Sequence, residues 1–415
     1  MLKKDLNQNG RVVFLDNIRY LIVLLVVVLH VAVAYSGMMP HWPVNDNNSV
    51  LFDIFLGICD ISLMPAMFFI AGYFVLKSIR KTGASRFILS KVIRLGIPWL
   101  VGVILFQPIH CYIYYSSRGM NGVDIWAIVF RELKTALSVH VGFASSPVEF
   151  NHYHFWFISL LLLFCIVFAL CYKLKHLFFK CSKSTNNRIL LSFSMLCILT
   201  IIAVVIMLKV ITLTLGDKYT LGWLKITPIL QFQPIKLPIY IASFSLGTYA
   251  CSKEWFTDGY CPGHPFLWGV FSIMLFVINL FLYMSLLKEY SLLLASVLAC
   301  VRIIMVYTVL LLLISFGVRY WNKASYIGKS LTENSYNIYL VHMVFALVIP
   351  FLLLNLDISI YLKFLIGTSL SIILSYIVSR YLIKTGLNLF LGSMGACSLI
   401  ATAPNDSVIK RLRKS

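Results

Sequence analysis

A series of long apolar runs constrains the fold of this chain more than any other feature. Windows of about 20 apolar residues, the length that a helix needs to cross a bilayer, recur along most of the sequence. Hydrophobic residues make up 60% of the chain and charged residues only 12%, which lies outside the usage of soluble globular proteins. The sequence therefore predicts an all-α, polytopic integral membrane protein. Its predicted transmembrane helices, about ten in number, are 14–36, 52–76, 95–116, 153–172, 190–212, 230–250, 266–287, 291–317, 335–355 and 359–382.

The lysines and arginines predict how these helices are oriented. They are concentrated in the loops after the second and fourth segments, whereas the first loop has none. By the positive-inside rule, the even-numbered loops and both termini are cytoplasmic. We divide the chain into a cytoplasmic tail (1–13), a transmembrane domain (14–390) and a basic cytoplasmic tail (391–415), whose run KRLRK is typical of an anchor to the membrane surface. The net charge of +20 is distributed over these loops, which argues against a nucleic-acid partner.

Two of the predicted outer loops are longer than a turn. The first, 117–151, contains an apolar but charged stretch, IWAIVFRELKTAL, that is typical of an amphipathic helix in the membrane interface. The second, 214–229, is shorter and mixed in character. These loops either form the walls of an outward-facing cleft or are simple surface connections.

The first apolar segment carries three polar side chains on one face. Asp16 lies three residues before Arg19, and the eleven steps from Arg19 to His30 return to within about 20° of the same direction on a helix. Each of these groups is costly in hydrocarbon, so the stripe must face protein or water. A titratable histidine at membrane depth is a candidate catalytic base. The alternative is that Asp16 and Arg19 pair at the membrane surface and that His30 is a satisfied core residue.

Two further charged residues lie inside apolar segments. Asp60 falls at a depth similar to that of His30 and could orient its imidazole. A salt bridge from Asp60 to Arg302 or Lys209 is the alternative. Arg302, in the middle of the eighth segment, could hold an anionic substrate group or stabilise developing negative charge on an oxygen. It could equally form a buried structural ion pair with Asp60.

Polar groups also mark the third and ninth segments. Lys91 and Arg94 lie one helical turn apart at the cytoplasmic surface, where they could bind phosphates or anchor the helix at lipid headgroups. Ser335, Tyr339 and His342 form a second polar stripe, which could line the inner half of the cavity that contains His30.

Histidines and cysteines give no sign of a metal site. The histidines in HYHFWF (152–157) are two residues apart and do not share a helical face, so we interpret this stretch as an aromatic belt at the outer interface. The ten cysteines are scattered, without the paired spacing of metal ligands.

Five stretches together resemble the membrane-bound acyltransferase family 3. They are LDNIR, with ten residues between its Arg19 and His30, then MFFIAGYF, RLGIPW, HFWFISLL and SYNIYLVH. Their order and spacing are similar to the ten-helix plan of that family. Within it, the stretch KLPIYIASFSLGTYA looks like the branch that includes glucan biosynthesis protein C.

The resemblance implies a function and a set of site residues. Members of this family move acyl groups onto extracytoplasmic glycans and related acceptors. The essential histidine of the family corresponds to His30 and its arginine to Arg19, and its aromatic-glycine motif matches Phe68, Phe69 and Gly72. The paired arginines at the third helix of the family appear here as Lys91 and Arg94. A lysine cannot make the bidentate phosphate contact of an arginine.

The combined prediction is a bacterial inner-membrane O-acyltransferase. It would move an acetyl or succinyl group from cytoplasmic acetyl-CoA or succinyl-CoA to a hydroxyl of an extracytoplasmic glycan or glycolipid, with no permanently bound cofactor and no metal. Transfer could be direct or pass through a covalent acyl group on His30 or Cys59. The alternative is a transporter of a glycan or small anionic solute, although the inverted repeat typical of transporters is not evident. The predicted site comprises catalytic His30, Asp60 and Arg302, donor-binding Arg19, Lys91 and Arg94, and supporting Asp16, Phe68, Phe69, Gly72, Tyr339 and His342.

Overall fold

The computed structural model of the chain describes most of the predicted transmembrane domain. It describes residues 12–120, 122–138, 141–143, 149–178, 189–226, 229–256 and 261–383. The predicted basic tail, 391–415, and nearly all of the N-terminal tail lie outside the described residues.

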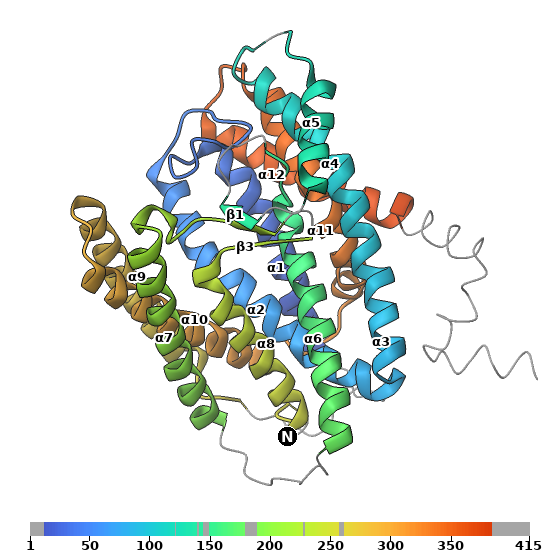
Figure 1. Cartoon of the computed structure of the whole chain (residues 1–415), viewed down its shortest axis with the longest axis vertical. Coiled ribbons are helices and arrows are strands. Elements are labelled where there is room, and N and C mark those ends of the chain that lie inside the picture. Colours follow the sequence, from blue (N-terminus) through green and yellow to red (C-terminus); the bar gives the residue numbers. More distant parts are fainter. Residues whose placement is uncertain are drawn as a thin grey trace, which may run out of the picture.

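The described residues form a bundle of long apolar helices, as predicted (Figure 1). Within the described part of the chain, nine helical segments are long and apolar enough to cross a membrane. The all-α, polytopic membrane fold is therefore confirmed. The helices are α1 (Val13–Ala32), α2 (Val50–Thr82), α3 (Ala84–Lys91), α4 (Ile97–Ser116), α5 (Ile125–Leu137), α6 (Trp156–Phe178), α7 (Ile189–Thr214), α8 (Leu237–Ser252), α9 (Pro265–Lys288), α10 (Leu292–Tyr320), α11 (Tyr326–Leu353) and α12 (Ile360–Ile377), with short 3₁₀ or π turns η1 (Val33–Tyr35), η2 (Val92–Gly96), η3 (Tyr153–Phe155), η4 (Asp217–Tyr219), η5 (Pro234–Lys236) and η6 (Val378–Ile383).

The sixth predicted segment, 230–250, is shorter than expected. Its helix, α8, has 16 residues and begins at Leu237, so it is about 24 Å long against a hydrocarbon core of about 30 Å. Residues 230–232 pair instead as a β-strand, and Pro234 and Pro238 follow. Proline lacks a backbone N–H and cannot continue a helix towards its N-terminus, so the helix starts late.

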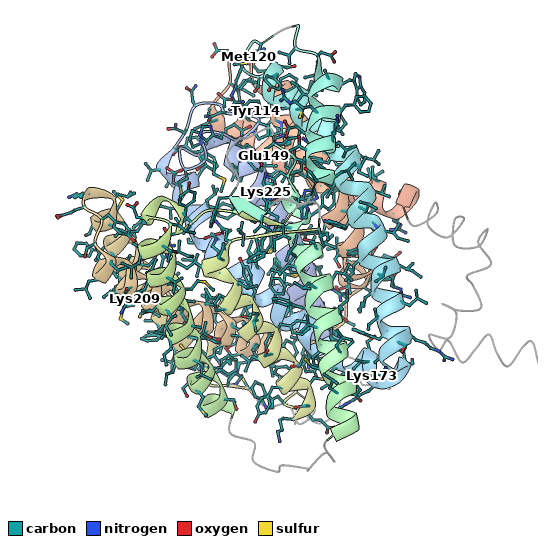
Figure 2. All side chains as sticks on the ribbon, in the orientation of Figure 1. Tyr114, Met120, Glu149, Lys173, Lys209 and Lys225 are labelled. Atoms are coloured by element: carbon teal, nitrogen blue, oxygen red, sulfur yellow. The ribbon has the colours of Figure 1, made fainter. Side chains whose placement is uncertain are left out.

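Helix α1 lies at the centre of the bundle, where it packs against α2, α10, α11 and α12. This central helix carries the predicted catalytic histidine. The ends of the bundle are also distinct: Met120 and Tyr114 lie at one end, and Lys173, near the predicted cytoplasmic end of α6, lies at the other (Figure 2). Helix α3, which follows the second predicted segment, lies at the same end as Lys173. Both basic stretches therefore begin at one end of the bundle, as the distribution of Lys and Arg predicts.

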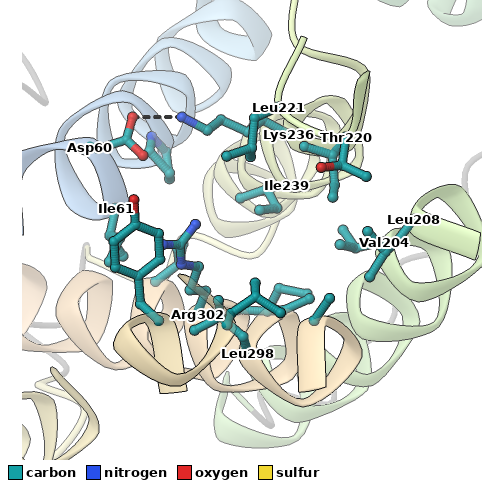
Figure 3. Close-up of a pocket in the computed structure, with 18 of the residues that line it drawn as sticks. Asp60, Ile61, Val204, Leu208, Thr220, Leu221, Lys236, Ile239, Leu298 and Arg302 are labelled. Carbon is teal, nitrogen blue, oxygen red and sulfur yellow. Dashed lines mark hydrogen bonds and ion pairs between the residues drawn. The ribbon is translucent and has the colours of Figure 1, made fainter. Parts of the chain in front are cut away.

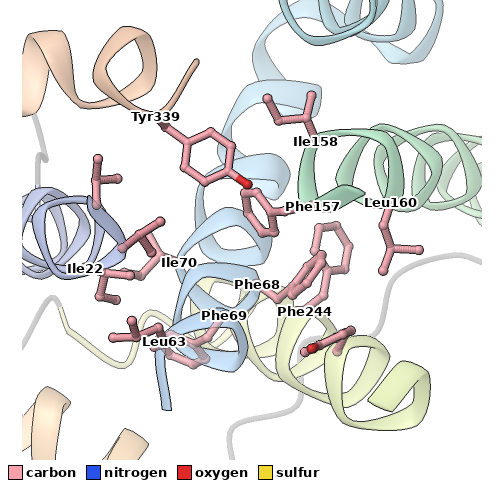
Figure 4. Packing of buried hydrophobic residues seen from close by; sticks show 14 of the residues in the cluster. Ile22, Leu63, Phe68, Phe69, Ile70, Phe157, Ile158, Leu160, Phe244 and Tyr339 are labelled. Carbon is pink, nitrogen blue, oxygen red and sulfur yellow. The ribbon is translucent and has the colours of Figure 1, made fainter. Parts of the chain in front are cut away.

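The aromatic-glycine motif is buried where α2 and α8 cross. Phe68 and Phe69 are completely buried, and the ring of Phe68 stacks on that of Tyr240 at 4.8 Å between centroids and packs edge-on against Phe157 at 4.9 Å (Figure 4). A Cβ atom added at Gly72 would collide with the backbone carbonyl of Phe244 in α8. The motif therefore shapes the core that supports the site, because only glycine allows the two backbones this approach.

The two long outer loops are joined by a small antiparallel sheet. Its strands, in the order β1 (Val141–Phe143), β2 (Leu224–Ile226) and β3 (Leu230–Phe232), come from both loops, and β1 pairs with β2 across them. The sheet crosses the upper part of the bundle in Figure 1, with α5 above it. Helix α5 coincides with the predicted amphipathic stretch, and Asp124 caps it by accepting a hydrogen bond from the Ala127 N–H.

A buried lysine connects this sheet to the first outer loop. Lys225, in β2, is only 4% exposed. Its Nζ lies 3.2 Å from a carboxylate oxygen of Glu149 and donates to the Phe150 carbonyl at 3.0 Å. Burial lowers the pKa of Lys225, and the charge of Glu149 opposes that shift. The two loops therefore form one structure and are not independent surface connections.

Gly72→Ala should destabilise the protein because the added methyl group forces α2 and α8 apart. We expect a loss of about 1–3 kcal/mol, the usual cost of overpacking, measured by thermal unfolding in detergent. Gly57→Ala is the matched control in the same helix, since nothing lies within 4 Å of the position that its new Cβ atom would occupy. Equal unfolding midpoints for the two variants would contradict this account of the helix crossing.

Candidate active site

Three histidines from distant parts of the chain meet near the outer end of α1. The ring of His342, in α11, lies 5.0 Å from that of His30 and 4.9 Å from that of His154, measured between centroids. The rings of His30 and His154 are 6.4 Å apart. His342 and His154 are buried, whereas His30 is half-buried. Of the predicted site residues, the structure therefore brings His30 and His342 into direct contact.

His154 is the member of this cluster that the sequence analysis missed. Its stretch resembles an aromatic belt, but His154 is only 3% exposed and points into the bundle. Its Nε2 lies 3.3 Å from the Leu340 carbonyl oxygen in α11. In the sequence, one feature indicated that His154 could lie beside His30: it stands at the outer start of a helix, at a depth similar to that of His30. The interpretation of His154 as an interfacial residue is wrong.

The hydrogen bonds of His30 and His342 define one consistent pair of tautomers. Nδ1 of His30 lies 2.7 Å from the Val26 carbonyl oxygen, and Nδ1 of His342 lies 2.7 Å from the Tyr339 carbonyl oxygen. A carbonyl oxygen can only accept, so both Nδ1 atoms carry hydrogen and both Nε2 atoms carry lone pairs. Nε2 of His342 then accepts from Nδ1 of His30 at 3.2 Å. This leaves Nε2 of His30 able to accept a proton.

Tyr339 contacts two members of the cluster. Its hydroxyl donates to the His154 carbonyl oxygen, which ties η3 to α11. Its ring lies 5.7 Å from that of His154 and 5.5 Å from that of His342. Ser335, one turn earlier, is buried and donates to the Thr332 carbonyl at 2.9 Å.

Arg19 and Asp16 form an ion pair towards the other end of α1. Nη2 of Arg19 lies 3.1 Å from Oδ1 of Asp16 and donates to the Thr332 carbonyl in α11 at 3.4 Å. Asp16 is only 6% exposed. The alternative interpretation of this pair therefore agrees with the structure, and the pair also connects α1 to α11. His30 lies about 16 Å further along α1 by helical rise.

Arg94 contacts the same part of α11 through its backbone, and Lys91 lies three residues before it. Lys91 ends α3 and Arg94 lies in the π turn η2. The Tyr336 hydroxyl donates to the Arg94 carbonyl at 2.7 Å, and Tyr336 lies four residues after Thr332 on α11. Helix α11 thus extends from a contact with the Arg94 backbone to the histidine cluster.

The predicted pairing of Asp60 with His30 is not formed. Asp60 instead pairs with Lys236, whose Nζ lies 2.6 Å from its Oδ1. Lys236 immediately precedes α8, which packs along α2, and this tertiary contact brings the two charges together. Neither Arg302 nor Lys209 is the ion-pair partner of Asp60. Its neighbour Cys59 is 4% exposed and packs in the hydrophobic core.

Arg302 is also separate from the histidine cluster. Its Nε donates to Oδ1 of Asn279 at 3.0 Å, and its guanidinium lies over the ring of Tyr283. Together with Asp60 and Lys236 it lines a cavity of about 120 Å³ that none of the three histidines lines.

A family model described as an acyltransferase domain matches residues 12–380. The chain belongs to the acyltransferase 3 family. Every residue of the predicted site lies within the matched region. No curated protein and no solved structure matches the chain, so the likeness to the branch of glucan biosynthesis protein C stays a prediction.

In this acyltransferase, the loop between α1 and α2 (36–49) covers His30. The ring of Trp42 stacks on that of His30 at 6.0 Å between centroids, with 24° between the planes. Arg118 holds the loop by donating to the carbonyls of Pro40, Trp42 and Pro43 at 3.0–3.2 Å. The indole N–H of Trp42 is buried and has no acceptor among the described residues.

A buried ion pair fixes the same loop of the acyltransferase to α12. Nζ of Lys363 donates to Oδ2 of Asp46 at 2.7 Å and to the Leu354 carbonyl at 2.9 Å. The side chains of Lys363 and Asp46 are only 5% and 9% exposed. This pair and Arg118 together hold Trp42 over His30.

Lys363→Met should strongly destabilise the acyltransferase because it leaves Asp46 buried without its partner. We expect a loss of about 3–5 kcal/mol, the usual cost of breaking one side of a buried pair. The double variant Lys363→Met, Asp46→Leu removes both charges and should recover much of that loss in thermal unfolding. Additive losses in the double variant would contradict the pairing.

Proposed function

We propose that this acyltransferase moves an acetyl or succinyl group from cytoplasmic acyl-CoA to a hydroxyl of an extracytoplasmic glycan or glycolipid. We further propose that it works in the cytoplasmic membrane of a bacterium. The observation that carries the proposal is the setting of His30. Its Nδ1 is committed to Val26 and His342, its Nε2 holds a lone pair, and its ring is half-buried beneath an outer loop.

His30 is the general base of the proposed reaction. A hydroxyl is a poor nucleophile at neutral pH, and removal of its proton during attack accelerates transfer. Nε2 of His30 takes the hydroxyl proton as the oxygen attacks the thioester carbonyl carbon. The carbon–sulfur bond then breaks, and the imidazolium returns the proton to the departing thiolate of CoA. The products are an ester and free CoA.

His342 and Trp42 assist at the two sides of His30. His342 accepts a hydrogen bond from Nδ1 of His30, and this bond becomes charge-assisted when the His30 ring is protonated. The unpartnered indole N–H of Trp42 is available to donate to the thioester oxygen as negative charge develops there. We favour Trp42 over Arg302 for this role because Trp42 contacts His30.

The donor enters from the cytoplasmic side along α11. Lys91 and Arg94 bind its phosphates, and Arg19, paired with Asp16, contributes positive charge beside them. The pantetheine arm then follows the face of α11 that carries Tyr336, Tyr339 and His342, so that the thioester reaches His30. This route follows a helix that contacts Arg19, the backbone of Arg94 and His30.

His30→Ala should abolish acyl transfer while the protein still folds. Loss of a general base lowers the rate by about 10²- to 10⁴-fold, measured with purified protein in liposomes, labelled acyl-CoA and a glycan acceptor. His41→Ala is the control, because His41 is an exposed histidine of the same outer loop. An unchanged rate in the His30 variant, with an unchanged unfolding midpoint, would overturn the assignment.

Lys91→Gln should raise KM for acyl-CoA because one contact to the donor phosphates is lost. A hydrogen bond to a charged group corresponds to about a tenfold or greater change. Lys91→Arg introduces the bidentate phosphate contact that a lysine cannot make, and it should lower KM for acyl-CoA below that of the unmodified protein. Lys81→Gln, at an exposed cation near the end of α2, should leave KM unchanged. Equal KM values for the Lys91 and Lys81 variants would exclude a donor role for Lys91.

The acceptor can be identified in cells. Mass spectrometry of surface glycans from cells with and without the gene should show a difference of one acyl group per modified residue. A difference of an acetyl or a succinyl mass would identify the donor class at the same time. Transport of a glycan across vesicles, without any acylated product, would instead support the alternative function of a transporter.

A further inference from the structure

A cavity lies apart from the histidine cluster, between α2, α7, α8, α9 and α10 (Figure 3). Its volume is about 120 Å³, and most of its wall is apolar, formed by residues such as Val204, Leu208, Ile239 and Leu298. The catalytic proposal uses none of these side chains. The cavity therefore has no role in the proposed acyl transfer.

The side chains that line the cavity carry a net charge of +1. Three of its lining residues are charged at neutral pH: Asp60, Lys236 and Arg302. Asp60 and Lys236 neutralise each other at 2.6 Å. Arg302 makes its hydrogen bond to a neutral partner, Asn279, and no carboxylate among the described residues lies within ion-pair distance of it. The charge of Asp60 also acts on Arg302, but this one carboxylate is shared with Lys236, so an anion in the cavity would be stabilised by the remaining positive charge.

The position of the cavity indicates where that anion comes from. Lys236 lies at the predicted outer end of α8, and Leu221, from the outer loop before it, also lines the cavity. Arg302 lies about one-third of the way along α10 from its outer end. The side chain of Asp60 is 54% exposed, so the cavity reaches the surface. It therefore opens in the outer half of the bilayer, where lipid headgroups and chains meet.

We propose that this cavity binds an anionic membrane lipid. The phosphate of the lipid pairs with Arg302, beside the Asp60–Lys236 pair, and an acyl chain packs against the apolar wall formed by α7 and α10. A free phosphate would leave the wall uncovered, and a neutral lipid would leave Arg302 unpaired. The site is independent of the acyl transfer proposed for His30.

Lipid titrations of the full-length protein in detergent, followed by native mass spectrometry, test the proposal. The probes are phosphatidylglycerol and phosphatidylcholine with identical chains, together with inorganic phosphate. We expect phosphatidylglycerol to bind at least about tenfold more tightly than phosphatidylcholine, the effect of one charge-assisted contact. Equal affinities for the two lipids would overturn the proposal, and so would equally tight binding of inorganic phosphate.

Two variants and one control assign the binding to this cavity. Arg302→Gln should remove the preference for phosphatidylglycerol, and Leu298→Trp should weaken lipid binding by filling the apolar part while all charges remain. Lys209→Gln is the control, because Lys209 is an exposed cation of α7 that does not line the cavity (Figure 2). A preference that survives in both the Arg302 and the Leu298 variants, or that is lost in the Lys209 variant, would show that the lipid binds elsewhere.

Discussion

The structure depends on one constraint: a polar group at the depth of the bilayer must find its partner within the protein. Water is not present there to satisfy it, and each unpaired group is costly. Asp16 meets this requirement through Arg19, and His30 meets it through Val26 and His342. The partner groups of Asp16 and His30 named here lie on a neighbouring turn of α1 or on α11. The polar stripe of α1 therefore contributes to the packing of these two helices.

The pairing of α1 with α11 also organises the proposed chemistry. At one end, Thr332 contacts Arg19 and Tyr336 contacts the backbone of Arg94. About 15 Å further along α11 by helical rise, His342 contacts His30. A donor bound at the cations and an acceptor presented from outside would thus meet at a base fixed by hydrogen bonds from the helices themselves. In this proposal, hydrogen bonds to Val26 and His342 orient the His30 ring without a buried carboxylate.

The outer face is fixed by contacts between loops that are distant in sequence. The sheet joins both long loops, and Lys225 is buried between Glu149 and the Phe150 carbonyl. Arg118 and Lys363 fix the loop between α1 and α2, which carries Trp42. These contacts give the loop over His30 a defined position, as the proposed binding of a hydroxyl acceptor requires.

The sequence by itself determined the helical membrane fold, the family and the position of His30 on a polar stripe, because hydropathy and helical spacing are local properties. It did not determine which polar groups meet. His30 and His342 are 312 residues apart, and Asp60 and Lys236 are 176 residues apart, so only the packing of helices could pair them. The same packing placed His154 beside His30 and separated Asp60 and Arg302 from it. Spacing along one helix shows which face a residue occupies, whereas the partner of that face depends on which helix packs against it.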